Sequence, residues 1–241
     1  MAICLSKEIS SRVLTDRRTD VAALPPELTR APLRTFRNDV LAARYTQPAV
    51  QLHRLREQGR VRRAARGVHY LVPDGADSGW RPSLESLAAG VATAAFGDRV
   101  PVLMHLSAAR VLGAVPRALA VAVVAVPEQR PPLVLEDRDD ARVVFVQRAV
   151  DALDAQLEGT DLGPVLVTSP EQTLLDLARR PGLLDLPGEV WDAVRGLWPR
   201  CDPAELERLA HEQRGRAALR RALAAREGQE PSPSRSSGRP A

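Results

Sequence analysis

The spacing of apolar side chains predicts a helix over residues 46–59. Its apolar positions recur three residues apart and form a narrow stripe along one face: Ala49, Leu52 and Leu55. Thr46 is expected to cap this helix, and Pro48 lies in the first turn, where a missing backbone N–H costs nothing. Gly59 stands at the position where helices commonly end.

A second face of this helix is polar. Its members recur at steps of four, three and four residues: Gln47, Gln51, Arg54 and Gln58. An arginine-rich hairpin is predicted directly after the helix, with strands at 60–63 and 68–71 and a turn at 64–67. A helix with a Gln/Arg face followed by a basic ribbon is the layout of a winged helix-turn-helix.

This layout predicts a DNA-binding surface. Gln47, Gln51 and Arg54 are candidates for base contacts, because Gln pairs with adenine and Arg with guanine through bidentate bonds in the major groove. Thr46 and Gln58 extend this candidate surface at the two ends of the helix. Phosphate or minor-groove contacts are expected from the hairpin, at Arg60, Arg62, Arg63, Arg66 and His69. Ordinary solvent-facing polar side chains are the alternative interpretation of the same pattern.

Shorter elements before the helix complete a module at residues 24–73. Residues 26–29 predict a short helix, residues 33–36 a short strand, and Asn38 can cap a helix that runs to Arg44. Residues 1–23 are polar and irregular, so we expect a flexible N-terminal arm. Residues 74–82 are rich in turn-forming side chains and predict a linker.

Residues 83–226 predict a larger mixed α/β domain. A helix capped by Ser83 and ended by Gly97 begins it. Residues 120–126 are continuously apolar, which predicts a strand buried on both faces. Further strands are expected at 100–104, 133–135, 143–146 and 165–167, with a helix at 108–112 capped by Ser107 and a helical turn at 153–157.

The last part of the chain predicts three helices and a tail. The first starts at Ser169-Pro170-Glu171-Gln172, where Ser caps and Gln can reach back to the cap. The others are expected at 188–197 and at 203–226, the latter capped by Asp202. Residues 227–241 are rich in Pro, Ser and Gly and predict a disordered tail. The predicted fold class is therefore α+β, an N-terminal winged helix-turn-helix followed by a larger mixed α/β domain.

Positive charge is concentrated in the predicted module. The 241-residue chain has a net charge of +4, yet residues 28–72 hold ten arginines against two acidic residues, which is +8 and leaves the remainder at −4. Such a distribution is typical of a nucleic-acid-binding protein with a second domain. Lys7 is the only lysine, so no P-loop, Schiff-base or nuclease lysine can exist beyond it.

The sequence favours a cytoplasmic protein that does not enter the membrane. No apolar run approaches the roughly 18 residues that a membrane span needs. The first twenty residues lack the apolar region and cleavage site of a signal peptide. Cys4 and Cys201 are too few for a disulfide framework or a zinc cluster.

Catalytic and metal-binding signals are weak. His105, Ser107 and Asp176 could be drawn as a triad, but no G-x-S-x-G turn surrounds Ser107, and Asp176 is expected to bond a backbone group or an arginine. The acidic run at 136–140 contains an arginine and has no histidine nearby, so we expect a solvated loop. No catalytic residue, metal or cofactor is therefore assigned.

Three segments, in this order, resemble the AbiEi-like antitoxins of type IV toxin–antitoxin systems in the form common in actinobacteria. They are LREQGRVRRAARGVHYLVP (55–73), VLMHLSAARVLGAVPRALAVAVVAVP (102–127) and GPVLVTSPEQTLLDLARRP (163–181). The resemblance covers most of residues 28–225. Relatives usually end the wing in Gly-Val/Tyr-Tyr, where this chain has Gly67-Val68-His69-Tyr70.

The resemblance implies a winged-helix domain that represses its own operon by binding inverted repeats in double-stranded promoter DNA. It also implies a C-terminal domain that counteracts a nucleotidyltransferase toxin without a stable complex, and no enzymatic activity. Two alternatives remain open: a DNA-targeted nuclease or transferase with a catalytic C-terminal domain, and a ligand-sensing repressor. The lysine-free body argues against a Glu-x-Lys nuclease site, and 3% aromatic content argues against an aromatic-lined pocket.

Overall fold

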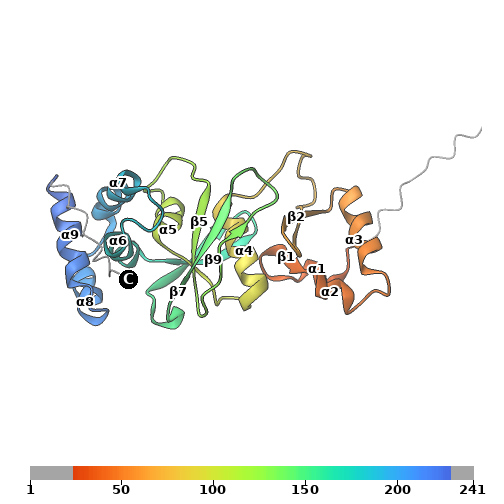
Figure 1. The fold of residues 1–241 in the computed structure, drawn as a ribbon, viewed down its shortest axis with the longest axis horizontal. Coiled ribbons are helices and arrows are strands. Elements are labelled where there is room, and N and C mark those ends of the chain that lie inside the picture. The colour runs from red at the N-terminus through yellow and green to blue at the C-terminus, as the bar shows by residue number, and fades with distance from the viewer. Residues whose placement is uncertain (1–23, 229–241) are drawn as a thin grey trace, which may run out of the picture.

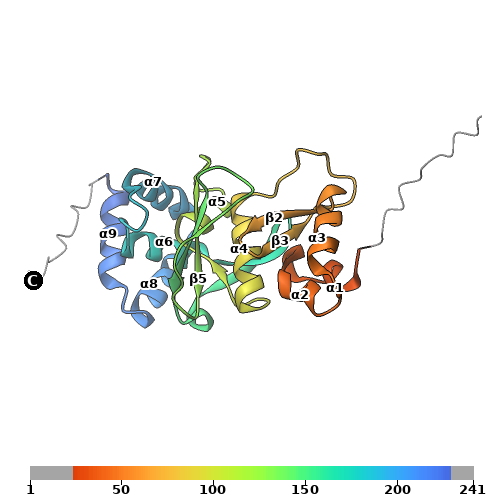
Figure 2. The ribbon, with the colours of Figure 1, turned by 45° about the vertical axis from the view of Figure 1, so that its right-hand side comes forward.

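The computed structural model describes residues 24–228, so the predicted N-terminal arm and nearly all of the predicted tail lie outside the described residues. The described elements form successive layers along the long axis of the molecule (Figures 1 and 2). Short helices at one end cover a three-stranded sheet, and α4 separates this sheet from a six-stranded sheet. The C-terminal helices pack at the far end. The predicted α+β class is confirmed.

The N-terminal part combines short helices with an antiparallel sheet. Its elements are α1 (Pro26–Thr29), η1 (Pro32–Arg34), β1 (Thr35–Arg37), α2 (Asn38–Ala42), α3 (Pro48–Glu57), β2 (Val61–Ala65) and β3 (Val68–Leu71). The strand order is β1-β3-β2, so β3 is central. The predicted hairpin is confirmed with a shorter turn at Arg66-Gly67, where Gly67 has a φ of 75°, a conformation that favours glycine.

One face of the small sheet packs against the short helices. The core beneath it is small, and its buried members are Leu28, Phe36, Leu41, Leu55, Val61 and Leu71. Leu55 is the only buried residue of α3, whereas Leu52 is half-buried and Ala49 is exposed. The predicted apolar stripe is therefore correct at Leu55, partly correct at Leu52 and wrong at Ala49, because α3 contacts the core mainly through its second half.

The opposite face of the small sheet packs against α4 (Leu84–Phe96), so this sheet is buried on both sides. Ala64, Ala65 and Tyr70 belong to the main hydrophobic core together with side chains of α4. Thr35 of β1 lies directly against Gly90 of α4, where an added Cβ would be 2.4 Å from Thr35 Oγ1. A glycine is needed here because the Thr35 side chain approaches the backbone of α4 closely.

The larger part is built around a mixed six-stranded sheet of order β6-β7-β5-β4-β9-β8. Its strands are β4 (Val102–Leu103), β5 (Val121–Val126), β6 (Leu133–Val134), β7 (Arg142–Gln147), β8 (Ala155–Thr160) and β9 (Gly163–Thr168). All six residues of β5 are buried, which confirms the predicted doubly covered strand. This strand runs parallel to β7 and antiparallel to β4.

Helices cover both faces of this sheet. Beside α4, they are α5 (His105–Val111), α6 (Pro170–Arg179), α7 (Pro187–Leu197), α8 (Pro203–Glu212) and α9 (Arg216–Arg226), with 3-10 turns η2 (Val150–Ala152) and η3 (Trp198–Arg200). The predicted caps Ser83, Ser169 and Asp202 accept backbone N–H groups of α4, α6 and α8. No helix between residues 24 and 228 combines the length and apolar character needed to cross a membrane.

Two predicted elements are wrong. Residues 153–157 do not form a helical turn, because residues 155–160 pair with β9 as strand β8. The helix expected at 203–226 is interrupted between Glu212 and Arg216. Arg214 there has a φ of 53°, and Gly215 packs against Ala210, which turns α9 back across α8. In both cases tertiary packing overrides the local pattern.

Three predicted capping interactions are replaced by longer-range bonds. Asn38 lies inside α2 and bonds His69 instead. Ser107 lies within α5, and its hydroxyl accepts the N–H of Val123 at 2.8 Å. Gln172 bonds Gln213 of the loop after α8 rather than its own cap. These side chains tie separate elements together, which local sequence does not reveal.

The contact between Gly90 and Thr35 predicts the effect of Gly90→Ala. In an unconstrained helix this change favours folding by about 1 kcal/mol. Here the new methyl group meets the β-branched Thr35 side chain, which is 3% exposed and cannot move freely. We expect the free energy of unfolding in urea to fall by about 1–3 kcal/mol.

Gly188→Ala is the matched control, since an added Cβ at Gly188 in the first turn of α7 meets nothing within 4 Å. It should leave stability unchanged or slightly raised. A Gly90→Ala variant as stable as the unmodified chain would show that α4 and the small sheet do not pack this closely.

Candidate nucleic-acid interface

α3 lies near the end of the molecule opposite the C-terminal helices (Figure 1). Gln47, Arg54 and Gln58 of the predicted polar face are exposed, and Gln51 is half-buried. Val50 lies on the same side and is 44% exposed, an unusual exposure for a large apolar side chain. The predicted polar face is therefore accessible, with its middle residue partly covered.

The ends of α3 agree only in part with the predicted caps. Thr46 is not the cap, because the N-cap residue is Gln47, whose side chain makes no capping hydrogen bond. Thr46 is exposed just before the helix. Gly59 has a φ of 68° and donates its N–H to the Arg56 carbonyl at 2.9 Å, as expected for a glycine that ends a helix.

Three of the four predicted hairpin arginines are engaged within the protein. The segment after β3 provides the acceptors for Arg60 and Arg62, and the loop after β6 provides the acceptor for Arg63. The contacts are Arg60 Nη2 to Asp74 Oδ1 (3.3 Å), Arg62 Nη1 to Trp80 O (2.7 Å), Arg62 Nη2 to Ser78 O, and Arg63 Nε to Glu136 Oε2 (3.0 Å). Arg66, at the hairpin turn, is exposed and has no such contact among residues 24–228.

His69 is not on the surface, contrary to the expectation that it contacts phosphate. It lies on the central strand and is 3% exposed. Its Nε2–H donates to Asn38 Oδ1 at 2.8 Å, and its ring centroid is 5.7 Å from that of Phe36. Burial, together with the nearby positive charges of Arg56 and Arg63, lowers the pKa of His69 to about 4.

The N-terminal part retains a surplus of uncompensated positive charge. The ion pairs Arg37–Asp39 and Arg44–Glu27 are exposed and contribute little. Among the described residues, five exposed arginines of this part have no carboxylate within ion-pair distance: Arg30, Arg34, Arg54, Arg56 and Arg66. These guanidinium groups leave a positive surface that attracts polyanions.

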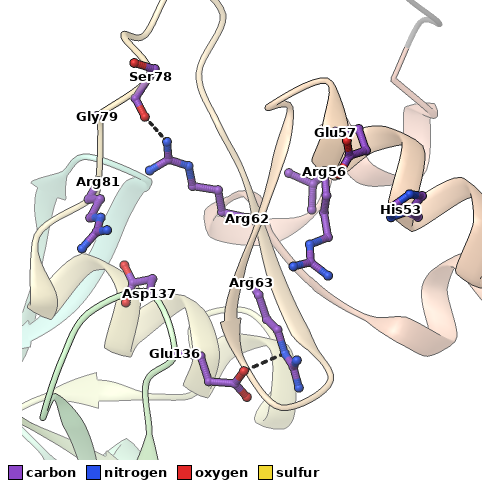
Figure 3. A pocket seen from close by; sticks show the side chains of 11 residues that line it. His53, Arg56, Glu57, Arg62, Arg63, Ser78, Gly79, Arg81, Glu136 and Asp137 are labelled. Atoms are coloured by element: carbon purple, nitrogen blue, oxygen red, sulfur yellow. Dashed lines mark hydrogen bonds and ion pairs between the residues drawn. The ribbon is translucent and has the colours of Figure 1, made fainter.

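A cleft of about 690 Å³ lies beside α3, where the N-terminal part meets the linker and the loop after β6. Figure 3 shows Arg56 on its helix side and Arg81 on its linker side. Its charged lining includes Arg56, Arg62, Arg63, Arg81, Glu136 and Asp137. The sequence alone does not indicate that Arg56 and Arg81 share a site, because they line the same cleft only once the linker is folded.

The triad considered from the sequence is not assembled. Each candidate has a structural partner: His105 Nε2 is 3.1 Å from the Arg180 carbonyl, and the Ser107 hydroxyl binds a backbone N–H of β5. Burial lowers the pKa of His105 to about 4. Asp176 pairs with Arg148 at 2.8 Å, which confirms the expected arginine partner, while burial raises its pKa and Arg148 opposes that rise.

The sequence predicted a solvated loop at 136–140, but this acidic loop is only partly solvated. Glu136 pairs with Arg63, and Asp137 pairs with Arg138 at 2.9 Å with only 3% of its side chain exposed. Arg138 also donates to the Pro82 carbonyl at 2.6 Å. Residues 24–228 contain no group of three or more His, Cys, Asp or Glu side chains placed to hold a metal ion. The loop instead joins the large sheet to the hairpin and linker.

Comparison with known proteins identifies the larger part of the chain. A family profile described as the AbiEi antitoxin C-terminal domain matches residues 100–224, which is more than half of the chain. The chain belongs to the AbiEi antitoxin family. An antitoxin role within a toxin–antitoxin system follows for this AbiEi protein, and the matched segment contains the large sheet from β4 to β9 and the helices after it.

The fold as a whole has a counterpart among solved structures. The RV2827C protein from Mycobacterium tuberculosis superposes with a TM-score of 0.52 at 20% sequence identity. The alignment covers 86% of this AbiEi chain and 79% of the other. At that identity the likeness concerns the fold alone. No curated protein matches the chain.

The buried His69 predicts a loss of stability in mild acid. Its folded pKa of about 4 is below the ordinary value of 6.5, so between these pH values the unfolded chain binds a proton that the folded chain does not. Stability is therefore present above pH 6.5 and is lost as the pH falls toward 4. Between pH 7 and pH 5, His69→Gln should lose about 2 kcal/mol less unfolding free energy than the unmodified chain.

His53→Gln is the control, because it removes an exposed histidine from α3 and leaves both buried histidines in place. Urea unfolding at the two pH values gives the comparison. Equal pH dependence in His69→Gln and His53→Gln would contradict a buried, neutral His69.

Proposed function

We propose that this AbiEi protein is a sequence-specific DNA-binding transcriptional autorepressor and the antitoxin of a type IV toxin–antitoxin system. The observation that carries the proposal is the exposed Gln/Arg side of α3 within a helix–sheet unit that has uncompensated arginines around it. Base edges are recognised by such side chains, and phosphates by such charge.

The order of elements supports a winged helix-turn-helix at residues 24–73. Helix, strand, two helices and a hairpin follow one another, and α2 and α3 are joined by a short turn at residues 43–47. In this arrangement the second helix of the pair enters the major groove. We propose residues 74–82 as the linker and residues 83–226 as the antitoxin domain.

The candidate DNA contacts fall into two groups, because several hairpin arginines are bonded within the protein. We propose that Thr46, Gln47, Gln51, Arg54 and Gln58 face the major groove and that Arg66 meets a phosphate. Arg60 and Arg63 already pair with carboxylates within the chain, so their main part in DNA binding is to hold the hairpin in place, whereas Arg62 is bonded only to neutral carbonyls and keeps its positive charge.

The antitoxin proposal adds a nucleotidyltransferase toxin as the antagonist, opposed without a stable complex. Family membership supports the antitoxin role itself. A protein that represses its own promoter acts where the DNA is, so we place it in the cytoplasm. We propose no enzymatic activity, supported by the structural partners of His105, Ser107 and Asp176. A metal-dependent activity assay would test the rival nuclease or transferase function.

DNA titration tests the proposal directly. The full chain should bind its own upstream DNA roughly 10³-fold or more tightly than scrambled DNA. The log–log salt slope should be about −4 to −6. Arg54→Ala should reduce this discrimination by about 1–3 kcal/mol because a base contact is lost. Arg66→Ala should weaken both DNAs alike and lower the slope by about one.

Arg220→Ala is the control, because Arg220 is exposed on α9 at the opposite end of the molecule. It should change neither affinity nor slope. Equal binding of own-upstream and scrambled DNA by the unmodified chain would refute sequence-specific autorepression.

A further inference from the structure

The cleft beside α3 is assembled from segments far apart in the sequence. It lies between α3, β2, residues 78–81 and residues 136–137, with a volume of about 690 Å³ (Figure 3). Backbone bonding fixes one side of it, since the Glu136 N–H donates to the Ala64 carbonyl of β2 at 2.8 Å. The cleft is therefore defined by backbone contacts at the junction between the two parts.

Both carboxylates on the loop side of the cleft are already neutralised. Glu136 pairs with Arg63 at 3.0 Å. Asp137 is almost fully buried and pairs with Arg138 through two bonds, at 2.9 and 3.1 Å. Neither carboxylate is therefore free to balance the remaining arginines.

Three guanidinium groups of the cleft keep their charge uncompensated. Arg62 donates to the carbonyls of Ser78 and Trp80, which are neutral acceptors. The guanidinium groups of Arg56 and Arg81 are exposed and have no hydrogen bond or ion pair among residues 24–228. Glu57 is the only carboxylate of the lining that is not already paired with an arginine among the described residues. The cleft therefore has a net positive charge in a concave, polar site.

We propose that this cleft is a phosphate-binding site formed by Arg56, Arg62 and Arg81. Planar guanidinium groups bind phosphate oxygens through paired, charge-assisted hydrogen bonds, and several around one concave site select a doubly charged or polyanionic group. Arg62 is held in position by its backbone acceptors, which reduces the entropy lost on binding. The same chemistry serves a phosphate of the DNA backbone beside α3 or a small phosphorylated molecule.

A bound phosphate would connect α3 to the linker. Arg56 belongs to the helix proposed to contact DNA, and Arg81 directly precedes Pro82, whose carbonyl is held by Arg138 of the large domain. Occupancy of the cleft thus adds a bond between the two parts and stabilises the folded chain by mass action. A phosphate supplied by the DNA backbone rests on the proposed function, whereas binding of a small phosphorylated molecule does not.

Two probes distinguish the two sources, with the full chain in each case. The test variant is Arg56→Ala/Arg81→Ala, and the matched control is Arg216→Ala/Arg220→Ala, which removes the same charge from exposed positions on α9. Inorganic pyrophosphate is titrated by calorimetry. A mixed-sequence DNA duplex and own-upstream DNA are titrated at several salt concentrations.

Loss of pyrophosphate affinity by at least about tenfold in the test variant, but not in the control, establishes a site for small phosphates. If pyrophosphate does not bind, a fall of at least about tenfold for both DNAs, with a salt slope smaller by about two, establishes the DNA backbone as the source. Arg56→Lys/Arg81→Lys should restore part of the affinity. Test and control variants that behave alike with both probes overturn the proposal.

Failure of the proposed function has a different signature. In that case the unmodified chain binds own-upstream and mixed-sequence DNA equally, yet the test variant still differs from the control with one of the probes.

Discussion

The close packing of the small N-terminal sheet against α4 is the constraint on which the rest of the arrangement depends. A three-stranded sheet with six buried side chains beneath it has too little core to be stable alone, and burial of its second face removes that weakness. The approach of Thr35 to Gly90 makes this contact tight. The N-terminal part and the large domain are therefore one packed body, with a linker that runs along their junction.

The packing of the hairpin against the linker and the loop after β6 determines which arginines remain free to bind a ligand. Hairpin arginines that would be free on an isolated wing are bonded to the linker and to the loop after β6. The remaining exposed positive charge lies on α3, at the hairpin turn and in the cleft beside α3. His69 is buried within the N-terminal part itself, against Phe36 and Asn38, so a residue expected on the surface becomes a source of acid sensitivity.

The sequence predicted the elements well where local signals were strong. The caps at Ser83, Ser169 and Asp202, the apolar run of β5 and the basic hairpin are all confirmed. It failed where partners came from elsewhere in the chain: β8 is a strand because β9 pairs with it, and Asn38 bonds His69 instead of capping. The exposed side of α3 was predictable from its period, whereas the cleft was not, since Arg81 and Arg56 line opposite sides of one cleft only after folding.

We propose that the protein binds DNA with the small sheet packed against α4. A disulfide between Thr35→Cys and Gly90→Cys tests it, because a Cβ at residue 90 lies 3.3 Å from that of Thr35, close to the roughly 3.8 Å of a disulfide. Cys4→Ser and Cys201→Ser remove competing thiols. The oxidised, locked chain should bind its own upstream DNA with the affinity of the reduced chain. Loss of binding on oxidation, restored by reduction, would show that the hairpin must leave α4 and would contradict this proposal.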